Sequence, residues 1–337
     1  MKLKYMIGSA VLALVAGTSA QAETVKIAIG GSSCICYLPT VLAEQLGNFE
    51  KHGVDVELID FKGGSAALKA VVGGSADVVS GYYEHTISLA AKKQQLASFV
   101  VMDRLPGLAL VVAPDKNEEI RSVADLKGKT VGVTAPGSST DFFLKYMLSR
   151  EGLEPTAASV VGVGLGATAV AALEKGQIDA VVTLDPAISQ LKKRHEGLNI
   201  LVDTRKEADA RHLFGADYAG GALYTRQEWI DAHPEQAQAL ASAIVDTLHF
   251  IHSNTPEDIA AKMPPELVGD DAKLYAESLK NSLEMISADG MMAPEAAKAV
   301  LEVMSFNSPE IKAADVDVSK TYTNAFVEKA AAGKLTQ

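Results

Sequence analysis

The chain has 337 residues, of which 48% are hydrophobic and 22% are charged, the composition of an ordinary globular protein. This length allows one large domain or two medium domains, each with a core of its own. The formal net charge of −11 argues against nucleic acid or an anionic membrane as a partner, and it leaves the charge of a small ligand open.

The first 22 residues have the pattern of a secretion signal. Lys2 and Lys4 give a positive start, an apolar run covers 6–16, and residues 20–22 read Ala-Gln-Ala, the A-x-A form of a cleavage site. The apolar run is short for a bilayer span, and no cysteine stands at the cleavage point to carry a lipid anchor. We therefore expect a mature chain that begins near Glu23 and is exported to the periplasm.

The two cysteines of the sequence, Cys34 and Cys36, are separated by one residue. In an oxidising compartment an even number of cysteines suggests a disulfide. A bridge at this spacing closes a very tight ring, and on a strand the two side chains would point to opposite faces. No further Cys or His pair completes a zinc site. We rank two reduced thiols first, a strained disulfide second and a metal site last.

Short β-branched runs alternate with helical patterns along the first hundred residues. Strands are predicted at 25–29, 54–59, 76–80, 99–102 and 109–112, and helices at 38–49, 65–72 and 86–93. This alternation indicates βαβ units and a mostly parallel sheet. In such sheets ligands bind beyond the carboxyl ends of the strands.

The stretch 131–150 is the strongest local signal for a site. A strand at 131–134 is broken at Pro136 and Gly137, and Ser138, Ser139 and Thr140 follow, all good helix N-cap residues. Apolar residues at helical spacing then begin at Phe142. A strand, a small-residue turn and a helix aim backbone N–H groups at one point, which favours an anion or a polar oxygen. The simpler alternative is an ordinary capped turn.

A faint internal repeat indicates two similar lobes. Residues 64–79 read as an Ala-rich helix, a Gly stop and an x-Asp strand start, and residues 166–181 repeat this pattern 102 residues further on. Further strands are predicted at 159–163, 180–183, 200–202 and 222–224. From Arg226 the pattern becomes helical, with a long amphipathic helix at 237–251 and a last helical part that ends near Lys329.

Several ordered pieces resemble the nitrate/sulfonate/taurine and thiamine-precursor group of periplasmic binding proteins, the NMT1/SsuA-like family. They are the segment 42–56 (LAEQLGNFEKHGVDV), Gly63-Gly64-Ser65 with Gly74-Ser75-Ala76-Asp77, the segment 125–133 (DLKGKTVGV), Gly176-Gln177-Ile178-Asp179-Ala180, Asp185-Pro186-Ala187, and His233-Pro234-Glu235 shortly after a Trp. Each piece is unspecific, but their order and spacing cover essentially all of the mature chain.

The resemblance implies an α/β, two-lobed periplasmic-binding-protein type II fold, in which each lobe is a mostly parallel sheet flanked by helices, with a helical C-terminal part. Lobe 1 would comprise 23–108 and 218–337, lobe 2 would comprise 109–203, and 204–217 would be the return crossover. It also implies a monomeric receptor that closes on a small molecule and delivers it to an ABC permease in the inner membrane.

The resemblance places the ligand-binding residues at the strand ends. They are Ser32, Ser33, Tyr37, Gly64, Ser65, Tyr82, Tyr83, Glu84, Ser138, Ser139, Thr140 and Asp185. The adjacent Tyr82 and Tyr83 suggest a platform for a flat or apolar group. Plain packing for each tyrosine, and a helix cap or rim charge for Glu84 and Asp185, are the structural alternatives.

The two acids set this chain apart from a plain sulfonate binder. A small oxyanion favours Arg or several hydroxyl donors, and carboxylates near it would repel it. If Glu84 and Asp185 line the cleft, the ligand carries N–H or O–H donors, as an aminopyrimidine or an amino-sulfonate does. The ligand classes that we consider are aminopyrimidines, sulfonates and aromatic acids.

Two other functions are possible on the same scaffold. Thiamine-pyrimidine-synthase relatives are enzymes that depend on a Cys-rich metal motif, whereas this chain has only Cys34-Ile35-Cys36. His85 next to Glu84 could be a general base, although a histidine at a helix start is more often a packing or capping residue. A ligand sensor that acts on a membrane receptor is the other alternative. We expect no enzyme, no cofactor and no metal.

Overall fold

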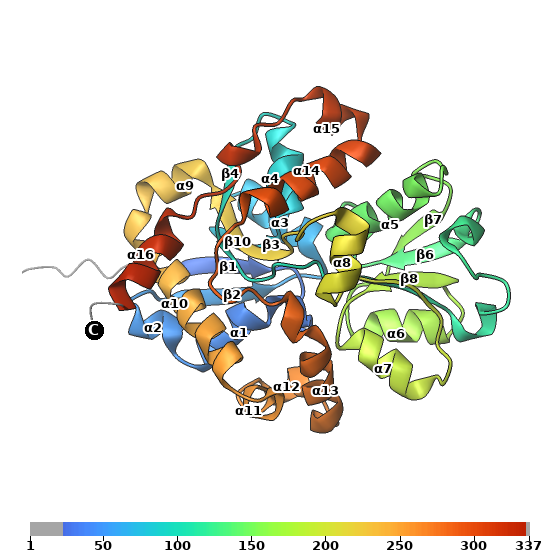
Figure 1. Ribbon diagram of the computed structural model, residues 1–337. Helices are drawn as coiled ribbons and strands as arrows, with labels where there is room; N and C mark the ends of the chain where they lie inside the picture. Colours follow the sequence, from blue (N-terminus) through green and yellow to red (C-terminus); the bar gives the residue numbers. More distant parts are fainter. Residues whose placement is uncertain (1–22, 335–337) are drawn as a thin grey trace, which may run out of the picture.

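The computed structural model describes residues 23–334, so the predicted export signal at 1–22 lies outside the described residues. The chain forms two five-stranded sheets flanked by helices (Figure 1). We call each sheet with its helices a lobe, and number the lobes by the first strand they contain. The precise boundaries predicted for the two lobes stay a prediction.

The sheet of lobe 1 has the order β2-β1-β3-β10-β4, and that of lobe 2 has the order β7-β6-β8-β5-β9. The strands of lobe 1 are β1 (Val25–Ile29), β2 (Val56–Asp60), β3 (Val78–Tyr82), β4 (Leu96–Val101) and β10 (Gly221–Arg226). The strands of lobe 2 are β5 (Ala109–Val112), β6 (Thr130–Val133), β7 (Ser159–Gly162), β8 (Ala180–Thr183) and β9 (Ile200–Asp203).

The helices cover the sheets and form most of the C-terminal part. The α-helices are α1 (Leu38–Gln45), α2 (Asn48–Lys51), α3 (Gly64–Val72), α4 (Glu84–Ala90), α5 (Ser139–Arg150), α6 (Ala167–Glu174), α7 (Ala187–Arg194), α8 (Glu207–Phe214), α9 (Gln227–Ala232), α10 (Pro234–Ser253), α11 (Pro256–Ala260), α12 (Pro265–Val268), α13 (Ala272–Ser282), α14 (Pro294–Asn307), α15 (Pro309–Ala313) and α16 (Ala325–Lys334). The 3₁₀ turns are η1 (Ile35–Tyr37), η2 (Pro114–Lys116), η3 (Val123–Leu126), η4 (Leu283–Met285) and η5 (Val318–Lys320).

Each sheet contains one reversed strand, and this strand is the first one after the chain enters the lobe from the other lobe. β5 runs antiparallel to β8 and β9, and β10 runs antiparallel to β3 and β4. The pairs β1 with β2 and β3, and β6 with β7 and β8, are parallel as the βαβ pattern predicted. The sheets are therefore mixed, and the parallel strands place their carboxyl ends at the facing edges of the two lobes.

The internal repeat corresponds to equivalent positions in the two sheets. Asp77 precedes β3, and its Oδ2 accepts a hydrogen bond from the N–H of Lys26 at 2.8 Å. Asp179 precedes β8, and its Oδ2 accepts one from the N–H of Thr130, also at 2.8 Å. Both carboxylates thus tie the entry of the central strand, β3 or β8, to the start of its parallel neighbour, β1 or β6, which explains why Asp recurs at this point.

Two differences from the sequence-based elements have local causes. The helix predicted over 38–49 is interrupted, because Gly47 adopts φ 68°, a left-handed conformation that separates α1 from α2. The polar segment 203–217 contains helix α8, whose buried face includes only Ala210 as a fully buried residue. With so little apolar periodicity, this helix gave no clear signal in the sequence.

Candidate functional site

Loops at the carboxyl ends of the strands bring the two lobes into direct contact. The backbone N–H of Ser65, in the first turn of α3, donates to Ser138 Oγ of lobe 2 at 3.1 Å. The two serine hydroxyls lie 3.3 Å apart, and His85 Nε2 lies 3.3 Å from the carbonyl oxygen of Gly137. The lobes are therefore closed on each other in this structure, with the starts of α3, α4 and α5 at the junction.

Glu84 lies among four buried tyrosines, Tyr37, Tyr82, Tyr218 and Tyr224, which we call the tyrosine cluster. All four side chains are at least 96% buried. Burial raises the pKa of each hydroxyl, and the negative charge of the nearby Glu84 adds to each rise. Glu84 is thus close enough to act on aromatic side chains from η1, β3, β10 and the segment after α8.

The Glu84 carboxyl group is buried without a complete set of partners. It opens α4, is 1% exposed, and its Oε2 has no hydrogen-bond partner within residues 23–334. Burial raises its pKa to about 8. An unpaired carboxylate in such surroundings is costly, because the charged form loses water without gaining a partner. Within the described residues no cationic side chain pairs with it.

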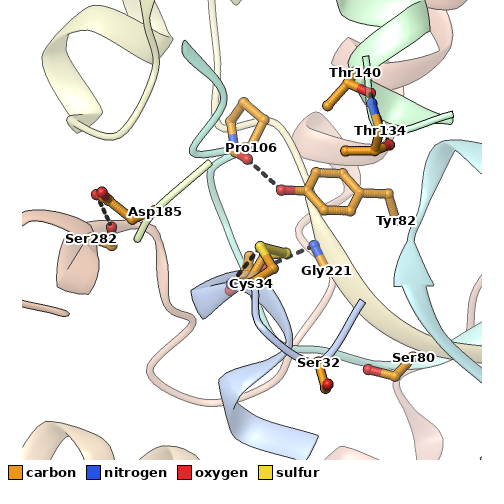
Figure 2. The surroundings of a disulfide bond; sticks show 12 residues. Ser32, Cys34, Ser80, Tyr82, Pro106, Thr134, Thr140, Asp185, Gly221 and Ser282 are labelled. Carbon is orange, nitrogen blue, oxygen red and sulfur yellow. Dashed lines mark hydrogen bonds between the residues drawn. A yellow bond between two sulfur atoms is a disulfide. The ribbon is translucent and has the colours of Figure 1, made fainter. Parts of the chain in front are cut away.

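The hydroxyl groups of the tyrosine cluster differ in how they are used. Tyr82 donates to the carbonyl oxygen of Pro106 at 2.6 Å, which fixes the ring against the first crossing between the lobes (Figure 2). The rings of Tyr37 and Tyr82 pack edge to face at 6.1 Å between centroids. The hydroxyl of Tyr37 lies against the backbone of Gly30 and Gly64, where an added Cβ would be 2.9 Å and 3.8 Å from its oxygen.

His85 separates the tyrosine cluster from lobe 2. Its Nδ1 lies 2.8 Å from the hydroxyl of Tyr224, while Nε2 faces Gly137. Burial lowers the pKa of His85 to about 4, so the ring is neutral at physiological pH. A Cβ at Gly64 would lie 3.0 Å from His85 Cε1, so a side chain here would require the imidazole ring to shift. Gly64 therefore lets the ring approach the backbone of α3.

Asp103 is a second buried acid at this site. It follows β4, is fully buried, and accepts a hydrogen bond from the N–H of Gly221 through Oδ2 at 3.1 Å. Its Oδ1 has no partner within residues 23–334. Burial raises its pKa well above the usual range, and its charge in turn raises the pKa of Tyr37 and Tyr82. Two carboxyl groups therefore face the same pair of tyrosines.

The turn before α5, predicted as an anion site, has most of its polar groups occupied by the protein. Asp141 Oδ2 accepts a hydrogen bond from the N–H of Gly137 at 2.8 Å. Thr140 Oγ1 accepts one from the N–H of Thr134 at 2.9 Å and so is directed back to the end of β6. Ser138 is the N-cap residue of α5, but its hydroxyl contacts Ser65 instead of capping its own helix.

The remaining predicted serines lie at the lobe junction without facing Glu84. Ser139 is buried in the first turn of α5. The N–H of Ser32 donates to Asp60 Oδ1 at 2.6 Å. Ser33 meets lobe 2 directly, since a Cβ at Gly166 would lie 3.2 Å from its Oγ. It also lines an interlobe cavity of about 530 Å³, together with Asp60, Lys62, Thr134, Leu165 and Thr168 among others.

Asp185 makes internal contacts with both of its carboxylate oxygens. Its Oδ2 accepts hydrogen bonds from Arg205 Nη1 at 2.8 Å and from Ser282 Oγ at 2.9 Å, and its Oδ1 accepts one from the N–H of Ser189 at 2.9 Å. Figure 2 shows the Asp185 side chain directed toward Ser282, on the opposite side of the disulfide from Thr134 and Thr140. Both oxygens are therefore occupied by an internal ion pair and its neighbours.

Tyr83 points away from Tyr82, as successive residues at the end of a strand do. Its hydroxyl is hydrogen-bonded to Thr321 Oγ1, and its ring packs in a separate apolar cluster with Ile87 and Val300. The expected platform of two adjacent tyrosines is therefore not formed. The partners of Tyr82 are instead Tyr37 and Pro106.

Cys34 and Cys36 form a disulfide, so the first-ranked expectation of two reduced thiols is wrong. The expectation placed the thiols in a loop and weighed strand geometry against a bridge, whereas residues 35–37 form the 3₁₀ turn η1 and bring the two Cα atoms to 5.1 Å. Both cysteines are buried. Between them, the N–H of Ile35 donates to the carbonyl oxygen of Asp185 at 3.0 Å, which makes this loop another contact between the lobes.

Sequence reasoning did not include Asp103, Tyr218 or Tyr224 among the site residues. Tyr224 lies within a strand, and Asp103 follows one directly, which is the same signal that pointed to Glu84. Tyr218 follows a crossover, so only the return of the chain to lobe 1 brings it near Glu84.

Two further findings concern residues 23–334. No helix in this range has both the length and the apolar character needed to cross a membrane. In the same range, no group of three or more His, Cys, Asp and Glu side chains is arranged to hold a metal ion.

Comparisons with known proteins give a consistent result. The model of the NMT1-like family matches residues 20–264. A solved structure from Bordetella bronchiseptica RB50 is 41% identical, covers 93% of this chain and 98% of its own, and superimposes with a TM-score of 0.90. The periplasmic aliphatic sulphonate binding protein SsuA of Escherichia coli is 21% identical over 89% of this chain and 97% of its own, with a TM-score of 0.64. A protein of Brucella abortus (strain 2308), named as a binding protein, is 29% identical over 74% of this chain and 73% of its own.

Proposed function

Because the chain belongs to the NMT1-like family, we propose that it is a periplasmic receptor that captures a small polar or aromatic organic molecule between its lobes and delivers it to an ABC permease. The similar proteins are binding proteins, and the two-sheet α/β architecture is that of periplasmic binding proteins. We further propose that the receptor acts as a monomer and that the permease recognises the closed form.

The buried Glu84 is the observation that carries this proposal. Its unpartnered oxygen lies at the carboxyl ends of the strands, where α/β sheets bind ligands. We propose that a ligand contacts Tyr37, Tyr82 and Glu84 in lobe 1, and that Ser65 and Ser138 come together when the lobes close over it. An unsatisfied polar group of this kind is rare in proteins unless a ligand, water or catalytic role accounts for it.

No observation favours the enzyme alternative. The disulfide leaves Cys34 and Cys36 without the free thiols that a cysteine-based metal motif would need. His85 is neutral, and both of its nitrogens already contact protein atoms, so a general-base role has no support in this geometry. A sensor would use the same ligand site, and the identity of the membrane partner would distinguish it from an import receptor.

The test is native mass spectrometry of the protein purified from periplasmic extract without denaturation. We expect a mass above that of the chain beginning at Glu23, and the release of a small molecule on unfolding. Adding the released molecule back should raise the melting temperature in proportion to its occupancy. Turnover of that molecule by the purified protein, or the absence of any bound or binding molecule, would contradict the proposal.

A further inference from the structure

The charged and polar groups near the unpartnered oxygen of Glu84 indicate which charge a bound ligand should carry. We propose, on the basis of the receptor function above, that this receptor binds an organic ammonium cation, with its positive nitrogen against Glu84 and within the tyrosine cluster. This assigns the ligand a charge opposite to that of the sulphonate of the SsuA comparison.

The first argument is that Oε2 of Glu84 has no cationic partner within residues 23–334, although an anionic ligand there would need one. The buried Arg205 is bonded to Asp185 and Asp203, so its guanidinium is not available to the site. His85 is neutral and bonded on both sides. An anion near Glu84 would therefore meet carboxyl groups and aromatic rings, and it would lose its water without gaining an opposite charge.

The second argument is the number of acceptors without a partner. Oε2 of Glu84 and Oδ1 of Asp103 are buried and unpartnered within residues 23–334. The two acids lie near each other, because Asp103 accepts a hydrogen bond from the N–H of Gly221, and Gly221 pairs in the sheet with Tyr82, two residues before Glu84. A ligand that carries a positive charge supplies the missing partner for Glu84. The unpartnered oxygen of Asp103 then offers a second polar contact.

The third argument is the aromatic surroundings. The charge of Glu84 acts on Tyr37, Tyr82, Tyr218 and Tyr224, four buried tyrosines that come from four different segments. Aromatic rings near a carboxylate suit an ammonium group, because ring faces are electron-rich and attract a cation. A sulfonate gains no such attraction from the rings.

The proposal has a defined pH dependence. The titratable groups near Glu84 are the four tyrosines and Asp103, whose pKa values burial raises, and His85, whose pKa burial lowers to about 4. The pKa of Glu84 is about 8, so its charge changes between pH 6 and pH 8. Because its pKa is about 8, its ionised fraction falls from about one half at pH 8 to about one hundredth at pH 6. The affinity for a permanently charged cation should therefore fall about fifty-fold over this range.

The experiment measures the binding of choline, tetramethylammonium and benzylammonium to the full mature protein at pH 8 and pH 6 by calorimetry and thermal shift. Ethanesulfonate and benzoate are the anionic probes. We expect at least one ammonium probe to bind, and Glu84→Gln to weaken it about 10- to 100-fold at pH 8 and to remove the pH dependence. Tyr275→Phe, a buried tyrosine on α13, is the control and should bind as the unchanged protein does.

Three results would overturn the ammonium proposal. The first is that an anionic probe binds and that Glu84→Gln does not weaken its binding. The second is that Glu84→Gln leaves the binding of the ammonium probes unchanged. The third is that no ammonium probe at millimolar concentration shifts the melting temperature. The receptor function is judged separately, by the molecule released in native mass spectrometry. An anionic molecule released there would keep the receptor function and reject the ammonium class.

Discussion

Glu84 couples the protonation of one side chain to the stability of the unliganded protein. Its pKa of about 8 in the folded state exceeds the value of 4.5 for an exposed glutamate, so the folded state binds the proton more tightly. This contribution to stability is fully present below pH 4.5 and is lost as the pH rises toward 8. The loss amounts to about 1.4 kcal/mol per pH unit within that window.

Glu84→Gln should therefore become progressively more stable than the unchanged protein as the pH rises from 5 to 8. Urea unfolding of the ligand-free proteins at both pH values measures this difference, and the solvent-exposed Glu151→Gln serves as a control with no such trend. An equal pH dependence of unfolding for the unchanged protein and Glu84→Gln would show that Glu84 is not held in its protonated form. Glu84→Gln is therefore expected to stabilise the fold and to weaken ligand binding.

Glu84 and Asp185 were both predicted to be ligand-binding residues because each lies just beyond the end of a strand, and the structure gives them different surroundings. Asp185 meets Arg205, which lies twenty positions further along and beyond another strand, so its partner could not be inferred from local pattern. Glu84 lies near four tyrosines, and its Oε2 has no partner within residues 23–334. Position relative to the strands can be read from a sequence, whereas the charge that a side chain finds there depends on tertiary contacts.

At the scale of elements, Ser138 at the start of α5 contacts the other lobe and does not cap its own helix. Ser138 Oγ accepts a hydrogen bond from the N–H of Ser65 and makes no capping hydrogen bond to α5. Removing this hydroxyl would therefore not change the capping of α5. Thr255 is different, because it caps α11 through a reciprocal pair with Asp258. Removing the Ser138 hydroxyl therefore tests the contact between the lobes, and removing the Thr255 hydroxyl tests the stability of a helix.

We expect Ser138→Ala to weaken ligand binding about five-fold, the value of one hydrogen bond near 1 kcal/mol, with little change in melting temperature of the unliganded protein. Thr255→Ala should lower stability by about 1 kcal/mol and leave the affinity unchanged. Thermal unfolding and calorimetry of both variants provide the comparison. Reduced stability of Ser138→Ala with unaltered affinity would contradict the interlobe role.

Local pattern predicted the strands well because β-branched runs such as 131–134 and 180–183 are short, apolar and followed within three residues by a proline. It did not predict which strand is reversed. The direction of β5 and β10 follows from the two passages between lobes, and no residue inside these strands encodes it. Helix α8 was missed because it is polar along most of its length, and its packing depends on Phe214 near its end.

At the scale of the whole molecule, an aromatic cluster joins the return crossover to lobe 2. Phe214 at the end of α8 stacks on Tyr146 of α5 at 5.9 Å between centroids, and its ring lies 6.5 Å from Phe143 and 4.5 Å from Tyr218. Tyr218 belongs to the tyrosine cluster around Glu84. A ligand that fixes Tyr218 therefore favours the same arrangement of Phe214 that holds lobe 2 in the closed position.

Phe214→Ala should shift the ligand-free protein toward an open form, because each aromatic pair is worth about 0.5–1.5 kcal/mol. Small-angle X-ray scattering should give a larger radius of gyration, and the apparent affinity should fall, since part of the binding energy is used to close the lobes. Phe326→Ala provides the control, because the Phe326 ring packs 6.2 Å from Phe99 of β4 in lobe 1, so this substitution removes an aromatic pair that does not involve lobe 2. An unchanged radius and affinity for Phe214→Ala would exclude this coupling.

The path of the chain through the two sheets also sets an order for folding during synthesis. All five strands of the lobe 2 sheet lie between residues 109 and 203, so this sheet is complete once that stretch has left the ribosome. The lobe 1 sheet lacks β10, which separates β3 from β4, until residue 226 has been made. Lobe 1 thus begins first and is completed last. The edges of β3 and β4 stay unpaired until β10 is synthesised, after the lobe 2 sheet is complete.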